Sequence, residues 1–251
     1  MKVTILGSGT STGVPMVGCS CPVCTSDDPR DRRSRASILV EHDGKYILVD
    51  TSTDLRRQAL REKIPHIDAV LFTHSHADHI HGIDDLRGFH FLHKRIIPCH
   101  ATEETLSVIS QNFSYIFKGM EKAGYAPLME PHAVHAAFDL FGLTVVPVPL
   151  MHGPMPATGY RFGNAAYLTD CSQIPENSLP LLEKLELLII DGLRYTPHPN
   201  HFNIEGALQV IKELAPRRAI LTHLTHEVPY RDRSKLPPGV DFAYDGMTIE
   251  I

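Results

Sequence analysis

The sequence predicts an α/β fold in a single domain that spans residues 1–251. Short apolar runs rich in β-branched and aromatic residues recur along the whole chain, and segments with helical periodicity separate them. No shift in composition, low-complexity tract or block of like charges marks a linker between two parts. Hydrophobic residues make up 43% of the chain, which is enough for a sizeable core. We therefore expect a compact, enzyme-like domain.

The charge and hydropathy of the chain limit its partners. It carries 24 Lys and Arg against 29 Asp and Glu, and the net charge of −5 gives no general attraction to nucleic acid or to an anionic membrane. Nucleic acid is therefore not a favoured partner, although a local metal site can override the global sign. No apolar run reaches the roughly 18 residues that a membrane span requires. The first predicted strand begins at Lys2, too early for a signal peptide, so a cytoplasmic protein is expected.

The first half of the chain is expected to form strands with helices between them. Asp43-Gly44 lies between two alternating apolar runs, 36–41 and 45–50, and this dipeptide is a strong hairpin signal. The glycine-rich loop 7–13 lacks the Gly-Lys-Ser/Thr ending of a phosphate-binding loop. The other expected elements are an edge-entry strand at 3–6, a helix capped within 51–54 that runs through Lys63, a strand at 67–72, a short helix and a strand within 84–100, and a helix from Thr102 to Phe117.

The second half repeats this arrangement, and its apolar strands end at chemically useful side chains. Between the strands expected at 185–190 and 219–222, a helix begins at Asn203 and keeps its apolar residues on one face. Residues 247–251 close the chain as a strand. The strands are expected at 143–150, 165–169, 185–190 and 219–222, and they lead to His152, Asp170, Asp191 and His223 respectively.

One stretch, T-H-S-H-A-D-H-I-H-G at residues 73–82, concentrates potential metal ligands directly after the strand at 67–72. It places His74, His76, Asp78 and His79 within six residues. A loop at a strand end can present several side chains to one point, and mixed imidazole and carboxylate ligands suit zinc, iron or manganese. The alternative is a polar loop that is rich in histidine by chance, but such a loop would not require this specific spacing. The stretch therefore predicts a metal site.

The spacing H-x-H-x-D-H-x-x-G resembles the signature of the metallo-β-lactamase superfamily. The resemblance implies an αββα sandwich with two divalent cations, zinc, manganese or iron, that share a bridging hydroxide. It also implies the ligands: His74, His76 and His152 for one cation, Asp78, His79 and His223 for the second, and Asp170 as the bridge between them. Asp78 is expected to take part in catalysis as well.

The cysteines indicate a second metal site rather than disulfides. Cys19, Cys21 and Cys24 crowd into C-S-C-P-V-C, and the chain has five cysteines, an odd number. A closed tetrahedral zinc site needs a fourth ligand, and His226, which lies three residues past the last candidate ligand of the first site, is the natural choice. A redox or incidental cluster is the alternative. The two remaining thiols, Cys99 and Cys171, are expected to be small buried hydrophobic residues.

The cysteine motif and the histidine that follows the last ligand resemble a narrower family, the phosphodiesterases of phosphonate degradation, which hydrolyse a phosphoribosyl cyclic phosphate. This resemblance runs in motif order from Leu6 to Met247 and includes G-V-P at 13–15 and D-G-M at 245–247. It implies that His201, which is not a metal ligand, assists the leaving group, a role that suits the pKa of imidazole. A neighbour of a helix cap is the alternative for this residue. The stretch D-G-L-R-Y at 191–195 departs from the family pattern.

The expected function is hydrolysis of a small, cyclic phosphodiester by a hydroxide that attacks phosphorus. Residues 87–135 are expected to cover the site. A tRNA 3′-processing nuclease of the same superfamily is one alternative, but it normally carries a basic, Gly/Pro-rich arm, and residues 87–135 show none. A thioesterase of the glyoxalase II type is another, but it adds a C-terminal helical domain, whereas 28 residues follow His223.

A metal-containing scaffold without turnover is the third alternative, from outside enzymology. The sequence leaves open the exact substrate, the native metal and the oligomeric state, a homodimer included. It also leaves open whether residues 87–135 act as a substrate lid or as a dimer contact.

Overall fold

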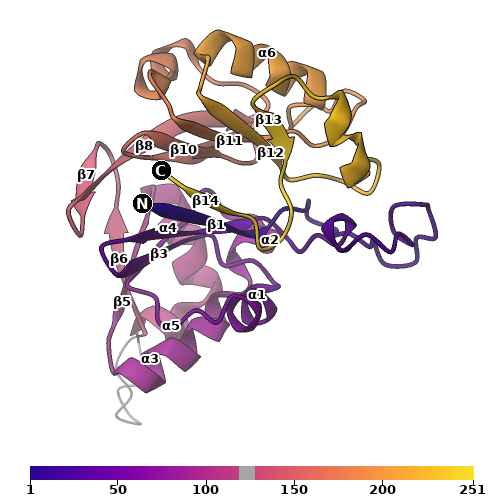
Figure 1. Cartoon of the computed structure of the whole chain (residues 1–251). Coiled ribbons are helices and arrows are strands. Elements are labelled where there is room, and N and C mark those ends of the chain that lie inside the picture. The colour runs from indigo at the N-terminus through magenta and orange to yellow at the C-terminus, as the bar shows by residue number, and fades with distance from the viewer. Residues whose placement is uncertain (119–127) are drawn as a thin grey trace.

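The computed structural model describes residues 1–118 and 128–251, and it forms four layers (Figure 1). Two mixed β-sheets pack face to face, and helices cover their outer faces. The two chain ends lie side by side on neighbouring strands of one sheet, and the loop that follows the first strand, drawn in indigo, projects from the body. This arrangement confirms the predicted αββα sandwich.

The first sheet has seven described strands in the order β14-β1-β2-β3-β4-β5-β6. They are β1 (Lys2–Gly7), β2 (Ser37–His42), β3 (Lys45–Val49), β4 (Ala69–Leu71), β5 (Ile97–Ala101), β6 (Met129–Ala133) and β14 (Thr248–Glu250). Pairing is antiparallel from β14 to β3 and parallel from β3 to β6. The hairpin at Asp43-Gly44 is confirmed. The expected edge position of the first strand is wrong, because the C-terminal strand pairs with its outer side through Val3 and Ile249.

The second sheet has the order β13-β12-β11-β10-β9-β8-β7 in the described part of the chain. Its strands are β7 (Phe138–Leu140), β8 (Leu143–His152), β9 (Met155–Phe162), β10 (Ala165–Leu168), β11 (Leu187–Asp191), β12 (Arg218–Thr222) and β13 (Val240–Phe242). Pairing is parallel from β10 to β13 and antiparallel from β7 to β10. The strands β6, β7, β9 and β13 were not predicted from the sequence. They are short, or they contain proline, glycine or charged residues that interrupt the apolar pattern.

The α-helices in the described residues are α1 (Leu55–Arg61), α2 (Ala77–Ile80), α3 (Arg87–His93), α4 (Glu103–Asn112), α5 (Ser114–Lys118) and α6 (Ile204–Leu214). The predicted caps of α4 and α6 are confirmed: Thr102 Oγ1 accepts a hydrogen bond from Thr105 N at 3.3 Å, and Asn203 Oδ1 accepts one from Gly206 N at 3.0 Å. The expected side-chain cap of α1 is wrong, because the Asp54 carboxylate pairs with Arg35 instead. The helix expected from Thr102 to Phe117 is interrupted at Phe113, whose backbone is not helical.

Three apolar layers hold the sandwich together. The central layer lies between the sheets and includes Ile47 and Tyr160. A second layer, which includes Leu48 and Ile109, joins the first sheet to its helices, and a third joins the second sheet to α6 through residues such as Ile211. Ile47 and Leu48 are consecutive in β3 and face opposite layers, which explains why this strand reads as a continuous apolar run. Cys99 and Cys171 are fully buried, as expected.

The described part of residues 87–135 forms crossover connections of the first sheet. Helix α3 connects α2 to the start of β5, and its His93 Nε2 lies 3.0 Å from the Pro65 carbonyl, just before β4. Helices α4 and α5 lead from the end of β5 back to the start of β6. These are crossover helices of a parallel sheet, and the expected cover over the site stays a prediction. Residues 119–127 lie outside the described residues.

Among the described helices, none has the length and apolar character of a membrane span.

Candidate metal centre

Seven predicted ligands meet at one end of the sandwich, at the carboxyl ends of the strands that precede them. We call them the His/Asp cluster: His74, His76, Asp78, His79, His152, Asp170 and His223. The first four follow β4, and the others end or follow β8, β10 and β12. Parallel strands in register bring their carboxyl ends to one edge of a sheet. Asp170 and His223 both have positive φ, 51° and 60°, so the chain turns sharply as soon as each strand ends.

Asp170 lies between two groups of ligands. Its Oδ2 is 3.7 Å from His74 Nε2 and 3.8 Å from His152 Nε2, and His76 belongs to the same group. Its Oδ1 is 3.1 Å from His79 Nε2 and 3.3 Å from His223 Nε2. Each carboxylate oxygen therefore faces one group, which is the arrangement that a bridging ligand requires.

Asp78 completes the second group. Its Oδ2 lies 3.4 Å from His79 Nε2 and 3.8 Å from His223 Nε2. Two ligands bound tetrahedrally at about 2.0–2.1 Å from one zinc ion are themselves about 3.3 Å apart, so these separations fit shared cations.

Several of these atoms are buried without a hydrogen bond. Among the described residues, Nε2 of His74, His79 and His223 and Oδ2 of Asp78 have no hydrogen-bond partner. An unpaired buried polar atom costs about 1–3 kcal/mol, and four such atoms in one cluster are unusual in a folded domain. A divalent cation in each group would satisfy all of them, so the donor set fits metal ions.

The electrostatics of the cluster also favour cations. Burial acts to raise the pKa of Asp170, but His223 and His79 outweigh it and hold that pKa well below its usual range. Burial acts to lower the pKa of His79, yet Asp170 and Asp50 raise it well above its usual range, and similar opposing effects raise the pKa of His223 to about 9. The buried carboxylates are therefore stabilised by nearby positive charge, which bound cations would supply.

Two further residues fix the orientation of the candidate ligands. His79 Nδ1 donates to Asp50 Oδ2 at 2.8 Å, and Asp50 also accepts from the backbone N and the Oγ1 of Thr73, both at 2.8 Å. His152 Nδ1 donates to the Asn200 carbonyl at 2.7 Å. Both imidazoles consequently present Nε2 to the cluster. Sequence analysis missed Asp50 and Asn200. Asp50 could have been found, because it ends a predicted strand as Asp170 does.

The glycine that ends the motif keeps the ligand loop close to the first sheet. A Cβ on Gly82 would lie 1.9 Å from the Ser52 carbonyl oxygen, so no other residue fits without a backbone shift. Thr51 N donates to the His79 carbonyl at 2.8 Å, and Gly82 N donates to the Thr51 carbonyl at 2.9 Å. These contacts fix the loop that carries the first four ligands.

His201 lies beside the cluster. Its ring stacks on that of His223, with centroids 4.8 Å apart, and meets the edge of His152 at 4.6 Å. Its Nδ1 donates to Asp191 Oδ2 at 2.6 Å, which leaves Nε2 as the nitrogen free to meet another molecule. The ring of His198, another residue that sequence analysis missed, lies 5.1 Å from His201. Asp191 is buried, so it holds the imidazole in one tautomer and orientation.

The predicted thiol cluster also comes together. His226 Nδ1 lies 3.3 Å from the Sγ atoms of both Cys19 and Cys21, and Cys24 belongs to the same group. All the cysteines are free. Backbone N–H groups point at all three sulfur atoms; for example, Cys24 N donates to Cys21 Sγ at 3.4 Å. This hydrogen bond, assisted by His226, lowers the pKa of Cys21 to about 6 against the opposing effect of burial, and a thiolate is the form that binds zinc.

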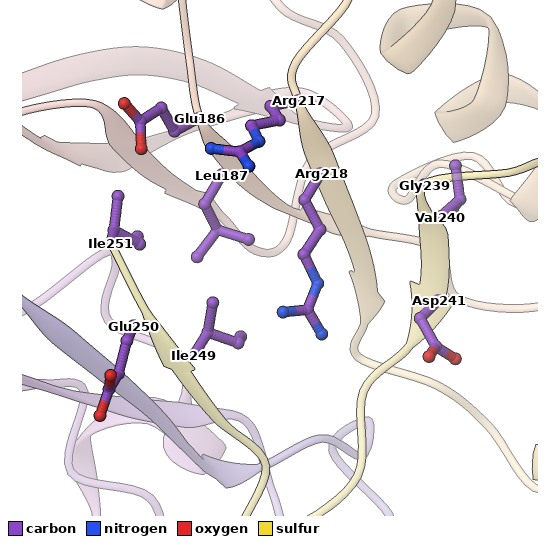
Figure 2. A pocket seen from close by; sticks show the side chains of 10 residues that line it. All are labelled: Glu186, Leu187, Arg217, Arg218, Gly239, Val240, Asp241, Ile249, Glu250 and Ile251. Atoms are coloured by element: carbon purple, nitrogen blue, oxygen red, sulfur yellow. The ribbon is translucent and has the colours of Figure 1, made fainter.

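A separate cavity of about 480 Å³ lies at the opposite end of the sandwich (Figure 2). Its residues Leu187 and Arg218 are paired at the start of β11 and β12, whereas Asp191 and Thr222 are paired at the ends of these strands, next to the His/Asp cluster. Figure 2 shows Arg218 extending toward the C-terminal strand that carries Ile249. The lining mixes arginines with acidic residues and contains no member of the His/Asp cluster. This cavity is therefore separate from the candidate metal centre.

A protein-family model covers the residues of the candidate metal centre. The family model of the β-lactamase superfamily domain matches residues 45–224. This range contains the whole His/Asp cluster and His201, but it excludes Cys19, Cys21, Cys24 and His226.

Relatives of known sequence have diverse names. The chain is 41% identical to an octanoyltransferase of Porphyromonas gingivalis over 253 residues, which cover 98% of this chain and 51% of that protein. The chain thus spans about half the length of this curated relative. It is 35% identical over 307 residues to the coenzyme PQQ synthesis protein B of Methylorubrum populi, with 100% of both chains covered.

Solved structures agree on the fold. A diphosphatase of the PhnP family has a TM-score of 0.93 and 43% identity, and the match covers 100% of this chain and 97% of that one. Zinc-bound PqqB of Methylobacterium extorquens has a TM-score of 0.83 at 21% identity with 100% of both chains covered, and short-form human tRNase Z has 0.74 at 19% with 100% and 99% covered. The last two matches show the fold alone. From the family model and the match to the diphosphatase, the chain belongs to the metallo-β-lactamase superfamily.

Proposed function

We propose that this chain is a dinuclear metal-dependent phosphodiesterase that hydrolyses a small phosphodiester, cyclic phosphodiesters included. The observation that carries the proposal is the position of Asp170, whose two oxygens face two separate groups of buried ligand atoms. A site for one cation would need only one of these groups. Attack at phosphorus by metal-activated water is the chemistry that such a pair of sites supports best.

The residues that would hold the cations follow from the two groups. His74, His76 and His152 would bind one, Asp78, His79 and His223 the other, and Asp170 both. When bound, such a pair of cations lowers the pKa of a water molecule and polarises the phosphoryl oxygens of a substrate. We expect zinc, manganese or iron there. Cys19, Cys21, Cys24 and His226 would hold one structural zinc, which stabilises the projecting loop.

His201 is the residue that we assign to the leaving group. Its Nδ1 is held by buried Asp191 at 2.6 Å, so a proton can be given from Nε2 to the departing oxygen while the carboxylate compensates the imidazolium charge. Asp78 is the other group that we assign to catalysis, because it is the half-buried carboxylate of the cluster and can contact both a cation and the attacking water.

The diphosphatase neighbour supports chemistry at phosphorus on a small molecule, since a diphosphate and a phosphodiester are cleaved by the same attack. The octanoyltransferase name does not assign acyl transfer to this chain, because the chain matches only half of that protein. The nuclease, thioesterase and scaffold alternatives have no observation of their own that favours them.

A hydrolysis screen tests the proposal. The protein, loaded with zinc, manganese or iron, is assayed on cyclic and linear phosphodiesters, diphosphates, a glutathione thioester and pre-tRNA. We expect the highest kcat/KM on a small phosphodiester. Faster turnover of the thioester or of pre-tRNA would overturn the proposal.

His201→Ala separates acid assistance from substrate binding. General acid catalysis contributes roughly 10²–10⁴-fold, so the variant should lose about this factor on alkyl or cyclic phosphodiesters, whose alkoxide leaves poorly. The loss on bis(p-nitrophenyl) phosphate should be much smaller, because nitrophenolate leaves without a proton. His135→Ala, which changes an exposed histidine that does not belong to the cluster, is the control. Equal losses on both substrates would leave His201 with a binding role only.

A further inference from the structure

A second cavity, of about 390 Å³, lies at the base of the loop that follows β1, between this loop and α1. None of its lining residues belongs to the His/Asp cluster or to the thiol cluster. Five arginines and two aspartates line it, an excess of three positive charges in a chain whose net charge is −5. Such a local reversal of sign concentrates anions.

Both aspartates of this cavity are already engaged. Asp54 pairs with Arg35 at 3.1 Å, and Asp245 pairs with Arg61 at 3.1 Å. Asp245 also accepts hydrogen bonds from the backbone and the hydroxyl groups of Ser8 and Ser34. These two ion pairs are therefore part of the wall, and their charges largely cancel.

The three other arginines differ from one another. Arg33 is fully buried and donates to the Thr225 carbonyl at 3.0 Å, so it is part of the scaffold. Arg32 and Arg57 are exposed, and neither side chain makes a hydrogen bond or ion pair with another described residue. They come from two different segments, the loop before β2 and helix α1. Two uncompensated guanidinium groups thus border one cavity.

The same cavity has an apolar side. Val14, Pro15, Val17 and Pro29 contribute to its lining. Val17 is 94% exposed, which is unusual for an aliphatic side chain beside a cavity. The lining contains no aromatic residue on which a nucleic-acid base could stack.

We propose that this cavity binds a small organic molecule that carries a phosphate or phosphonate group. The guanidinium groups of Arg32 and Arg57 donate to the anionic oxygens, because the planar fork of arginine matches the geometry of a phosphate. The organic part packs against Val14 and Val17. The volume falls in the range of roughly 300–1,000 Å³ that is usual for small-molecule sites.

Phenylphosphonate is a suitable probe, because it has an anionic and an apolar part and its carbon–phosphorus bond is not a target for a phosphodiesterase. The zinc-loaded, ¹⁵N-labelled full chain is titrated with it and followed by NMR. We expect saturable shifts of the Gly13 amide and of the Nε–H groups of Arg32 and Arg57. Signals from the His/Asp cluster report separately on any binding to the metal ions.

The combined variant Arg32→Gln and Arg57→Gln should bind the probe roughly a hundredfold more weakly at Gly13, about tenfold for each charged hydrogen-bond donor removed. Arg56→Gln, which changes an exposed neighbour on α1 that does not line the cavity, should retain wild-type affinity. The melting temperature and the remaining spectrum show whether the variants are folded.

Three results would overturn the proposal: shifts confined to the His/Asp cluster, an undiminished affinity of the double variant, or tighter binding of a single-stranded oligonucleotide at the same arginines. Equal affinity for inorganic phosphate and phenylphosphonate would overturn the assignment of the apolar side.

Discussion

Replacing Asp50 by asparagine tests how the scaffold positions a metal ligand without touching the ligand itself. Asp50 is fully buried and accepts three hydrogen bonds of 2.8 Å, one from His79 Nδ1 and two from Thr73. Asparagine has the same shape, but it offers one acceptor oxygen, and its NH₂ group faces a donor. Losing a partner of this kind typically costs 10–100-fold in metal affinity, and we expect Asp50→Asn to fall in that range.

The assay is a competition titration of the zinc-loaded protein with a chelator, with zinc counted per chain. The weaker affinity should appear in the His/Asp cluster, while the thiol-bound zinc stays in place. Asp43→Asn is the matched control, because Asp43 is exposed in the β2–β3 turn at φ 46°, a conformation that asparagine also adopts. Wild-type zinc affinity in Asp50→Asn would show that Asp50 does not position His79 for metal binding.

Three further variants test the thiol cluster, the bridging carboxylate and a buried histidine. Cys21→Ser should remove about one zinc per chain and lower the melting temperature, whereas Ser20→Ala in the same loop should change neither; wild-type zinc content in Cys21→Ser would contradict the structural site. Asp170→Ala should lower the occupancy of both cluster sites and reduce activity by several orders of magnitude, and a variant that kept two cluster metals would remove the bridge. Burial, together with His132, lowers the pKa of His100 to about 4, so the unfolded chain binds more protons than the folded one between about pH 6.5 and 4, and stability falls as the pH drops through this window. His100→Leu removes this loss. In urea unfolding, the stability of the variant relative to wild type should rise by about 1–2 kcal/mol from pH 7 to pH 4.5, a range that allows for the partial exposure of His100. A difference that does not change with pH would show that His100 does not cause the loss of stability.

The sequence predicted the strand ends well, because the chemistry is concentrated there. Runs such as 187–190 are buried on both faces and therefore read as continuous apolar segments, and the polar residue that follows each run marks the edge of the sheet. The four candidate ligands His74, His76, Asp78 and His79 could be predicted in the same way, because they directly follow an apolar run. The order in which the strands pair was harder to predict from the sequence. The short β14 changes the first strand from an edge to an interior strand, and its three residues carry almost no pattern.

Contacts between distant parts of the chain could not be read from the sequence. Asp50 and His79 are 29 residues apart, and only the pairing of β3 with β4 brings the carboxylate to the imidazole. Asp54 looked like a helix cap because of its place before α1, but Arg35 from another segment takes its carboxylate. The helix within residues 102–117 breaks at Phe113, a residue whose propensity does not indicate a break.

Anomalous X-ray diffraction from crystals of the metal-loaded protein, with data collected on both sides of the absorption edge of the metal, tests directly whether Asp170 bridges two cations. The expected result is two peaks on either side of Asp170, about 3.5–4 Å apart, each bonded to a different oxygen of its carboxylate, and a third peak among the three cysteines and His226. A single peak in the His/Asp cluster at full occupancy, or a pair of peaks that Asp170 does not bridge, would contradict it.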